Sequence, residues 1–101
     1  MERKGELQEA LAAYRQAVDF SEEVIRTRAN DRLALTELAM NQMSVGDTLD
    51  TLGQSRSALT EYQQSLSHLR ALSQDDPLDT RVSRQLATNH DSIGGVAPGF
   101  R

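Results

Sequence analysis

The sequence contains no cysteine and no tryptophan, and it is poor in proline, glycine and aromatic residues. Without cysteine, disulfides and thiolate metal sites are excluded. Two prolines and six glycines in 101 residues favour long helices over a turn-rich β fold. Aromatic residues make up only 4% and hydrophobic residues 38%, so a core must be built mainly from Leu, Val and Ala between helices. The length fits one domain, 1–101.

Positive charge and long apolar runs are also scarce. The chain has 11 basic and 15 acidic residues, a net charge of −4, and a single lysine, Lys4. We expect no nucleic-acid binding, because that mode draws its affinity from phosphates neutralised by clustered Lys and Arg. No apolar run approaches the roughly 20 residues that span a bilayer, and the polar N-terminus lacks a signal-peptide apolar region. We therefore expect a cytoplasmic protein without membrane association.

Residues that could carry catalysis or bind a metal are not arranged for it. The only histidines, His68 and His90, lie 22 residues apart, with no HExxH motif and no carboxylate at ligand spacing. No G-x-S-x-G motif is present, and Gly94, Gly95 and Gly99 follow an expected helix, whereas a phosphate-binding loop would precede one. The sequence predicts no enzyme activity, no metal site and no cofactor.

An internal repeat of 48 residues organises the chain. When residues 5–46 are aligned with 53–94 without a gap, 11 of the 42 pairs are identical. A fixed period of this size is typical of stacked repeats, in which each unit buries its apolar face on the next. The identical pairs, by position, are Gly5/Gly53, Ala10/Ala58, Leu11/Leu59, Tyr14/Tyr62, Gln16/Gln64, Asp31/Asp79, Leu38/Leu86, Ala39/Ala87, Asn41/Asn89, Ser44/Ser92 and Gly46/Gly94.

Apolar residues at helical spacing divide each period into two helices. We expect a first helix over about 5–28, and a second that Asp31 caps and Gly53 ends in a left-handed conformation. A third helix ends before Pro77, which cannot continue it, and Asp79 caps a fourth. Short loops make neighbouring helices antiparallel. The second helix has one polar break in its apolar stripe, at Gln42.

The segment Val45-Gly46-x-x-Leu49, then Gly53, then Ala58-Leu59-x-x-Tyr62 resembles the core of a tetratricopeptide (TPR) repeat. The resemblance implies that a small residue in one helix lets the paired helix approach, while a small residue and an aromatic of that second helix fill the space between them. It implies an all-α, TPR-like α-solenoid of four helices in antiparallel hairpins, forming a right-handed superhelix segment. The residues that match the repeat-packing pattern are Gly46, Leu49, Gly53, Ala58, Leu59, Tyr62, Ala10, Leu11, Tyr14 and Gly94. The domain divides into a second-helix half repeat (5–29), one complete repeat (31–78), a first-helix half repeat (79–95) and an irregular tail (96–101).

Two features depart from the family pattern. Gln42 replaces the aromatic usually found early in the first helix. The period of 48 exceeds the usual value of about 34 residues, by an amount close to two extra turns per helix. The chain is similar to a long-period variant found in tandem in large bacterial multidomain proteins, beside kinase or nucleotide-hydrolase signalling domains. This resemblance implies a scaffold or signalling context.

The resemblance implies that the first helices of the pairs line a concave groove, which binds a peptide or partner domain. Counting from Gly46, the solvent-facing groove positions are expected to be Met40, Met43, Asp47, Asp50 and Thr51. Such a strip would suit apolar and basic side chains, because Met adapts to irregular surfaces. The alternative for the two methionines is packing on the adjoining helix. The recurring Asn41/Asn89 and Ser44/Ser92 either bond to a neighbouring helix or contact a bound peptide backbone.

A second function stays open beside peptide binding. The expected first helix has no preceding partner, and Pro98 and Gly99 stop the last helix early. Open solenoid ends are normally covered by polar caps. The chain is therefore either a piece of a longer array or a possible homodimer through its open ends. In that second reading, it is an architectural spacer or oligomerisation segment with no ligand of its own.

Overall fold

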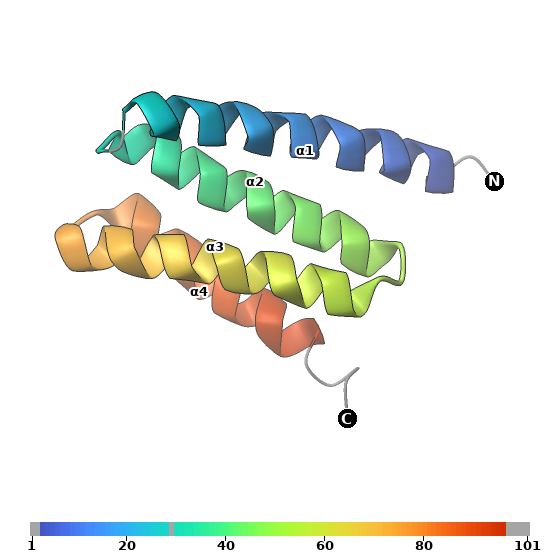
Figure 1. Ribbon diagram of the computed structural model, residues 1–101. Coiled ribbons are helices and arrows are strands. Elements are labelled where there is room, and N and C mark those ends of the chain that lie inside the picture. The colour runs from blue at the N-terminus through green and yellow to red at the C-terminus, as the bar shows by residue number, and fades with distance from the viewer. Residues whose placement is uncertain (1–2, 29, 97–101) are drawn as a thin grey trace.

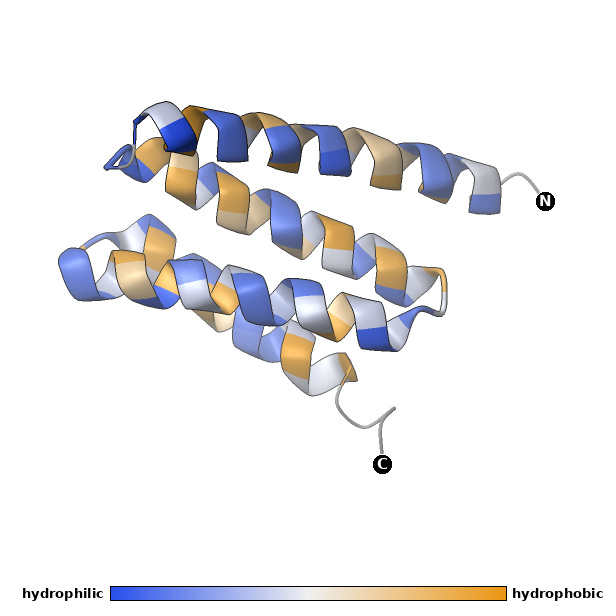
Figure 2. Cartoon of the chain, in the orientation of Figure 1, coloured by the Kyte–Doolittle hydropathy of each residue, from blue (hydrophilic) through white to orange (hydrophobic). Residues whose placement is uncertain are grey.

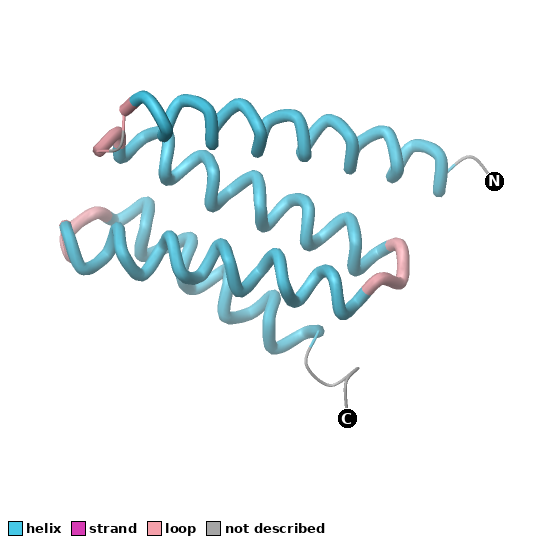
Figure 3. Tube along the Cα trace, in the orientation of Figure 1, coloured by secondary structure: helices cyan, strands magenta, loops and turns pink. Residues whose placement is uncertain are grey.

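The described part of the chain consists of four helices, as the sequence predicted. The computed structural model describes residues 3–28 and 30–96, and over these it contains α1 (Arg3–Thr27), α2 (Arg32–Thr51), α3 (Ser55–Asp75) and α4 (Thr80–Val96), with no strand (Figure 1). Consecutive helices run antiparallel and are joined by short loops (Figure 3). The all-α arrangement of helical hairpins is confirmed, and the right-handed superhelix stays a prediction.

Two of the helices are capped at their N-termini by the side chains that the sequence predicted for this role. Asp31 accepts a hydrogen bond from the Ala34 backbone N–H at 3.0 Å. Asp79 accepts from the backbone N–H groups of Arg81 at 3.1 Å and Val82 at 3.4 Å. The first N–H groups of a helix have no acceptor inside the helix, so these carboxylates provide acceptors for them. Both predicted N-caps are confirmed.

The end of α2 depends on a residue that can adopt positive φ. Gly53 has φ +86°, the left-handed conformation that costs other residues a steric clash with Cβ. This conformation lets the Gln54 N–H donate to the Leu49 carbonyl at 2.8 Å and the Gly53 N–H donate to the Asp50 carbonyl at 3.0 Å. The paired bonds form a Schellman motif, so the predicted role of Gly53 is confirmed.

Arg32 ties three helices together, a contact that the sequence did not predict. Its guanidinium donates to the carboxylate of Asp75 at 2.8 Å and to that of Asp79 at 2.9 Å. The start of α2 is thereby joined to the end of α3 and the start of α4. Nothing in the spacing of these residues indicated the contact, because it depends on how the loops fold.

The helices form one layered stack with α2 at its centre. α2 packs against α1, α3 and α4, while the backbone of α1 comes close only to that of α2 among the described helices. Hydrophobic residues recur along each helix between hydrophilic ones (Figure 2). Two core clusters result. One contains Ala39, Met43, Leu69, Leu72 and Val82, and the other Val45, Leu49, Ala58, Tyr62 and Val96.

Gly46 and Tyr62 are in direct contact where α2 and α3 cross. A Cβ built on Gly46 would lie 2.6 Å from Cε1 of Tyr62 and 2.8 Å from its Cδ1. Tyr62 is only 2% exposed, so its ring has little room to withdraw. The expectation that a small residue here lets the paired helix approach is confirmed. Among the other repeat-packing residues, Leu49 and Ala58 are buried and Leu59 is half-buried.

The equivalent residues at the two ends of the stack are less covered. Tyr14, the counterpart of Tyr62, is 37% exposed, and Ala10 and Leu11 are half-buried. A Cβ on Gly94, the counterpart of Gly46, would meet nothing within 4 Å. α4 extends one residue further than predicted, because Val96 packs in the core at 3% exposed. The rest of the predicted tail, with Pro98 and Gly99, lies outside the described residues.

Candidate functional site

Four of the five residues predicted to line a groove are exposed on α2, and one is not. Met40 is 42% exposed, and Asp47, Asp50 and Thr51 are exposed as well. The prediction that Met43 faces solvent is wrong, since its exposed fraction is 5%. Met43 packs in the core cluster with Leu69, Leu72 and Val82, because α4 covers that side of α2. The alternative, packing on the adjoining helix, is correct for Met43.

The side chain of Asp47 is held in place by a contact with α3. The Tyr62 hydroxyl donates a hydrogen bond to the Asp47 carboxylate. Burial raises the pKa of Tyr62, and the bond to Asp47 raises it further, so the phenol stays protonated and remains a donor. One carboxylate of the exposed face therefore has a fixed position, which lowers the entropy lost when it binds a partner.

The hydroxyls and carboxylates further along α2 are used mostly within the chain. The Thr51 hydroxyl donates to the Asp47 carbonyl at 3.0 Å, and Ser55 donates to Asp50 at 3.4 Å. The Ser44 hydroxyl donates to the Met40 carbonyl at 3.3 Å, inside the same helix.

Asn89 is fully buried, and its amide donates to the Tyr62 carbonyl at 3.0 Å. For Asn89, bonding to a neighbouring helix is confirmed.

Beside the predicted residues lies an apolar surface that the sequence analysis missed. Phe20 of α1 is 71% exposed and Leu33 of α2 is 52% exposed. Both line a cavity of about 170 Å³ between the two helices, together with Val24, Ala34 and Glu37. Positions 33, 40 and 47 are separated by seven residues, about two helical turns, which could have indicated that Leu33, Met40 and Asp47 share a face. We call Phe20, Leu33, Glu37, Met40, Asp47, Asp50 and Thr51 the α1–α2 face.

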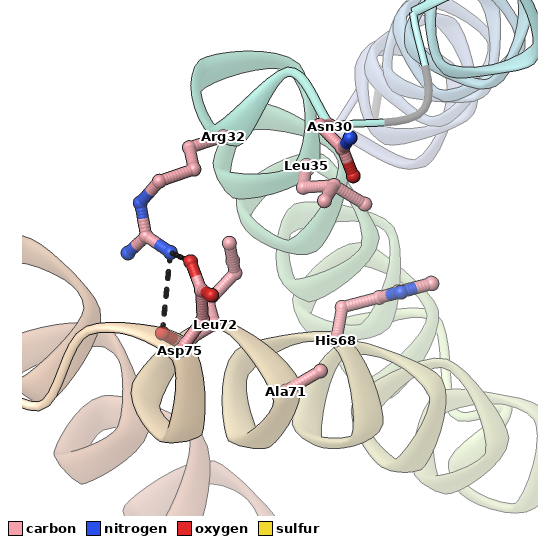
Figure 4. A pocket seen from close by; sticks show the side chains of 7 residues that line it. All are labelled: Asn30, Arg32, Leu35, His68, Ala71, Leu72 and Asp75. Carbon is pink, nitrogen blue, oxygen red and sulfur yellow. Dashed lines mark hydrogen bonds and ion pairs between the residues drawn. The ribbon is translucent and has the colours of Figure 1, made fainter.

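A larger cavity, of about 460 Å³, opens where α2 begins and α3 ends. Asn30, Arg32, Leu35, His68, Ala71, Leu72 and Asp75 line it (Figure 4). Its one guanidinium is turned toward Asp75 and is already paired. Burial lowers the pKa of His68, which the Glu22 carboxylate partly opposes. The charged groups of this cavity thus have partners within the chain, and nothing in it selects a ligand.

A third cavity lies between α1 and α3, over the middle of α2. It measures about 230 Å³ and contains the buried Gln42. Two positions along a helix correspond to a rotation of about 200°, so Gln42 points to the opposite side of α2 from Met40. The break in the apolar stripe at Gln42 was the sequence signal for this cavity. Arg15, Val18, Asp19, Glu22, Val45, Glu61 and Gln64 complete its lining.

The described residues show neither a metal cluster nor a membrane span. Over the described ranges, no group of three or more His, Cys, Asp or Glu residues could hold a metal ion. None of the described helices is both long enough and apolar enough to cross a bilayer. No family model, curated protein or solved structure matches the chain.

Proposed function

We propose that the chain is a TPR-like protein-interaction module that acts in the cytoplasm and binds a partner segment on its α1–α2 face. The observation that carries this proposal is the apolar cavity between Phe20 and Leu33 beside a line of exposed acids. Exposed apolar side chains that share one cavity mark interaction sites more often than scattered ones do. The module has no catalytic role in this proposal.

The chemistry of the face defines the segment that would fit. Phe20 and Leu33 together offer an anchor site for one apolar side chain. Glu37 and Asp47 follow along α2 and favour basic side chains, since complementary charge aids encounter and specificity. Met40 lies between them and adapts to varied contacts. The proposed partner is a segment with one apolar residue followed by Lys or Arg.

A peptide-display selection on the immobilised chain tests this function. We expect selected peptides to combine an apolar residue with Lys or Arg. Asp47→Asn with Asp50→Asn should weaken their binding at least several-fold, and Leu33→Glu should abolish it. The Asp47→Asn change keeps an acceptor for the Tyr62 hydroxyl, so it removes charge without removing that bond.

A charge-matched control separates local contact from net charge. Gln63→Lys with Gln74→Lys raises the net charge by two, as the double Asn variant does, but both residues lie on the outer side of α3. This control should bind the selected peptides almost as tightly as the wild type. Equal losses in both variants, or full binding by Leu33→Glu, would show that the α1–α2 face is not the site.

A further inference from the structure

The cavity between α1 and α3 has features that the α1–α2 face lacks. The backbones of α1 and α3 do not approach each other closely over the described residues, and both helices pack on α2. The space between them is floored by Gln42 and Val45 of α2. Because Gln42 is rotated by about 200° from Met40, a ligand bound at Gln42 would lie on the other side of α2 from Met40. Binding in this cavity would therefore be independent of the peptide binding proposed above.

Gln42 is a buried amide whose oxygen makes no hydrogen bond within the described part of the chain. It is 3% exposed, and its Nε2 donates to Oε1 of Gln64 at 3.3 Å. Its Oε1 has no hydrogen-bond partner among the described residues. A buried acceptor without a partner is unfavourable by about 1–3 kcal/mol. Gln42 is one of the residues that line the cavity, so a donor that reached this oxygen from the cavity would remove that cost.

The charge around the cavity decides which donor fits. Three carboxylates, Asp19, Glu22 and Glu61, line it, against one guanidinium, that of Arg15. Burial raises the pKa of Glu61, and the nearby Glu22 carboxylate adds to this rise, while Arg15 opposes it. A partly desolvated carboxylate such as that of Glu61 attracts a cation more strongly than an exposed one does.

We propose that this cavity binds the guanidinium group of an arginine side chain presented by a partner protein. A guanidinium has five N–H donors in a planar fork and no acceptor. It can donate to Gln42 Oε1 at the floor and to a carboxylate of the wall at the same time. A lysine ammonium is more strongly hydrated and is a compact point charge, so it loses more on entering such a space.

The choice of arginine rests on two separate observations. The acidic wall alone would accept any cation, and the unpaired Gln42 oxygen alone would accept any donor. A cation that carries several N–H groups meets both requirements, and the weaker hydration and planar fork of the guanidinium favour arginine over lysine. The apolar stem of arginine can lie against Val18 and Val45, which also line the cavity.

The test uses short capped peptides with one variable residue, Gly-Arg-Gly, Gly-Lys-Gly and Gly-citrulline-Gly, titrated into the isotopically labelled chain. We expect the arginine peptide to shift the side-chain amide signals of Gln42 and Gln64 in a saturable manner. The lysine peptide should bind several-fold more weakly, and the uncharged citrulline peptide should leave these signals unchanged. No shift with the arginine peptide, or equal binding by lysine or citrulline, would overturn the proposal.

Two variants and one control complete the experiment. Gln42→Leu should weaken binding of the arginine peptide about tenfold, because a hydrogen bond to a charged group is lost. The same variant should raise the melting temperature, since it removes an unpaired buried acceptor. Glu61→Gln should also weaken binding, while Asp47→Asn, on the opposite side of α2, should not. Wild-type affinity in both Gln42→Leu and Glu61→Gln would refute the site.

Discussion

The contact between Gly46 and Tyr62 makes a sharp prediction about stability. In most exposed helix positions, replacing Gly by Ala stabilises a protein by up to about 1 kcal/mol, because Ala has the higher helix propensity. At Gly46 the added methyl would lie 2.6 Å from Cε1 of Tyr62 and 2.8 Å from Cδ1. Carbon atoms normally approach to about 3.5–4.0 Å. The methyl group can be accommodated only if the ring or a helix moves.

The size of the effect follows from what surrounds the ring. Tyr62 is 2% exposed, its hydroxyl is bonded to Asp47, and Asn89 bonds its backbone carbonyl. Overpacking a site of this kind costs about 1–3 kcal/mol. After subtraction of the propensity gain, Gly46→Ala should lower the free energy of unfolding by up to about 2 kcal/mol. For a domain of this length, each kcal/mol corresponds to about 4–8 °C in melting temperature.

Gly94→Ala is the matched control. Gly94 is the repeat counterpart of Gly46, and a Cβ there would meet nothing within 4 Å. This variant should be neutral or more stable by up to about 1 kcal/mol, because it gains propensity in the last turn of α4. Urea denaturation of both variants isolates the packing cost as the difference between them, about 1–3 kcal/mol.

A double variant checks that the ring itself causes the loss. In a Tyr62→Leu background the aromatic ring is absent, so Gly46→Ala should be much less destabilising there than in the wild type. The two changes should therefore show a clear coupling energy. If Gly46→Ala were as stable as Gly94→Ala, the reasoning from close helix approach would be refuted.

Two further predictions concern α2 and the loop that follows α3. Met43→Ala should destabilise the chain by about 2–5 kcal/mol in urea denaturation, as expected for a buried methionine. Met40→Ala, on the exposed face, should cost less than about 1 kcal/mol in the same experiment. Equal losses would contradict the burial of Met43. The hydrogen bond from Arg32 holds the pKa of Asp79 below its usual value. The ionised form is therefore favoured by folding, so this contribution is present above about pH 4 and is lost as pH falls through the lowered pKa of the folded state. Asp79→Asn should flatten the acid side of a plot of stability against pH, while Asp91→Asn at an exposed site should leave its shape unchanged.

Much of the fold could be read from local patterns. The positions of Asp31, Gly53 and Asp79 identified where helices begin and end, because capping depends on a few neighbouring backbone groups. The 48-residue repeat gave the equivalence of Gly46 and Gly94 and of Tyr14 and Tyr62. Repeat equivalence did not give equal environments, however. Tyr62 is buried between α2 and α4, while Tyr14 lies on α1, which packs only on α2.

The candidate site was predicted less completely than the fold. The predicted exposure is confirmed at Met40, Asp47, Asp50 and Thr51, because the helices packed on α2 leave these four positions uncovered. The predicted exposure was wrong at Met43, because the periodicity of one helix does not show how much of its surface a neighbouring helix covers. Phe20 was not predicted either, because the cavity that it lines is completed by Leu33 of another helix.

The sequence by itself determined the number of helices, their ends, their antiparallel order and the one close approach that Gly46 permits. Each of these depends on residues near one another in the chain, or on a repeat that can be aligned by eye. Only the tertiary structure decided that Arg32 joins Asp75 and Asp79. It also placed Gln42, whose oxygen has no partner among the described residues, in a cavity that three carboxylates line. Contacts of this kind depend on the relative rotation and spacing of packed helices. The side-chain volumes of the whole core jointly determine that rotation and spacing.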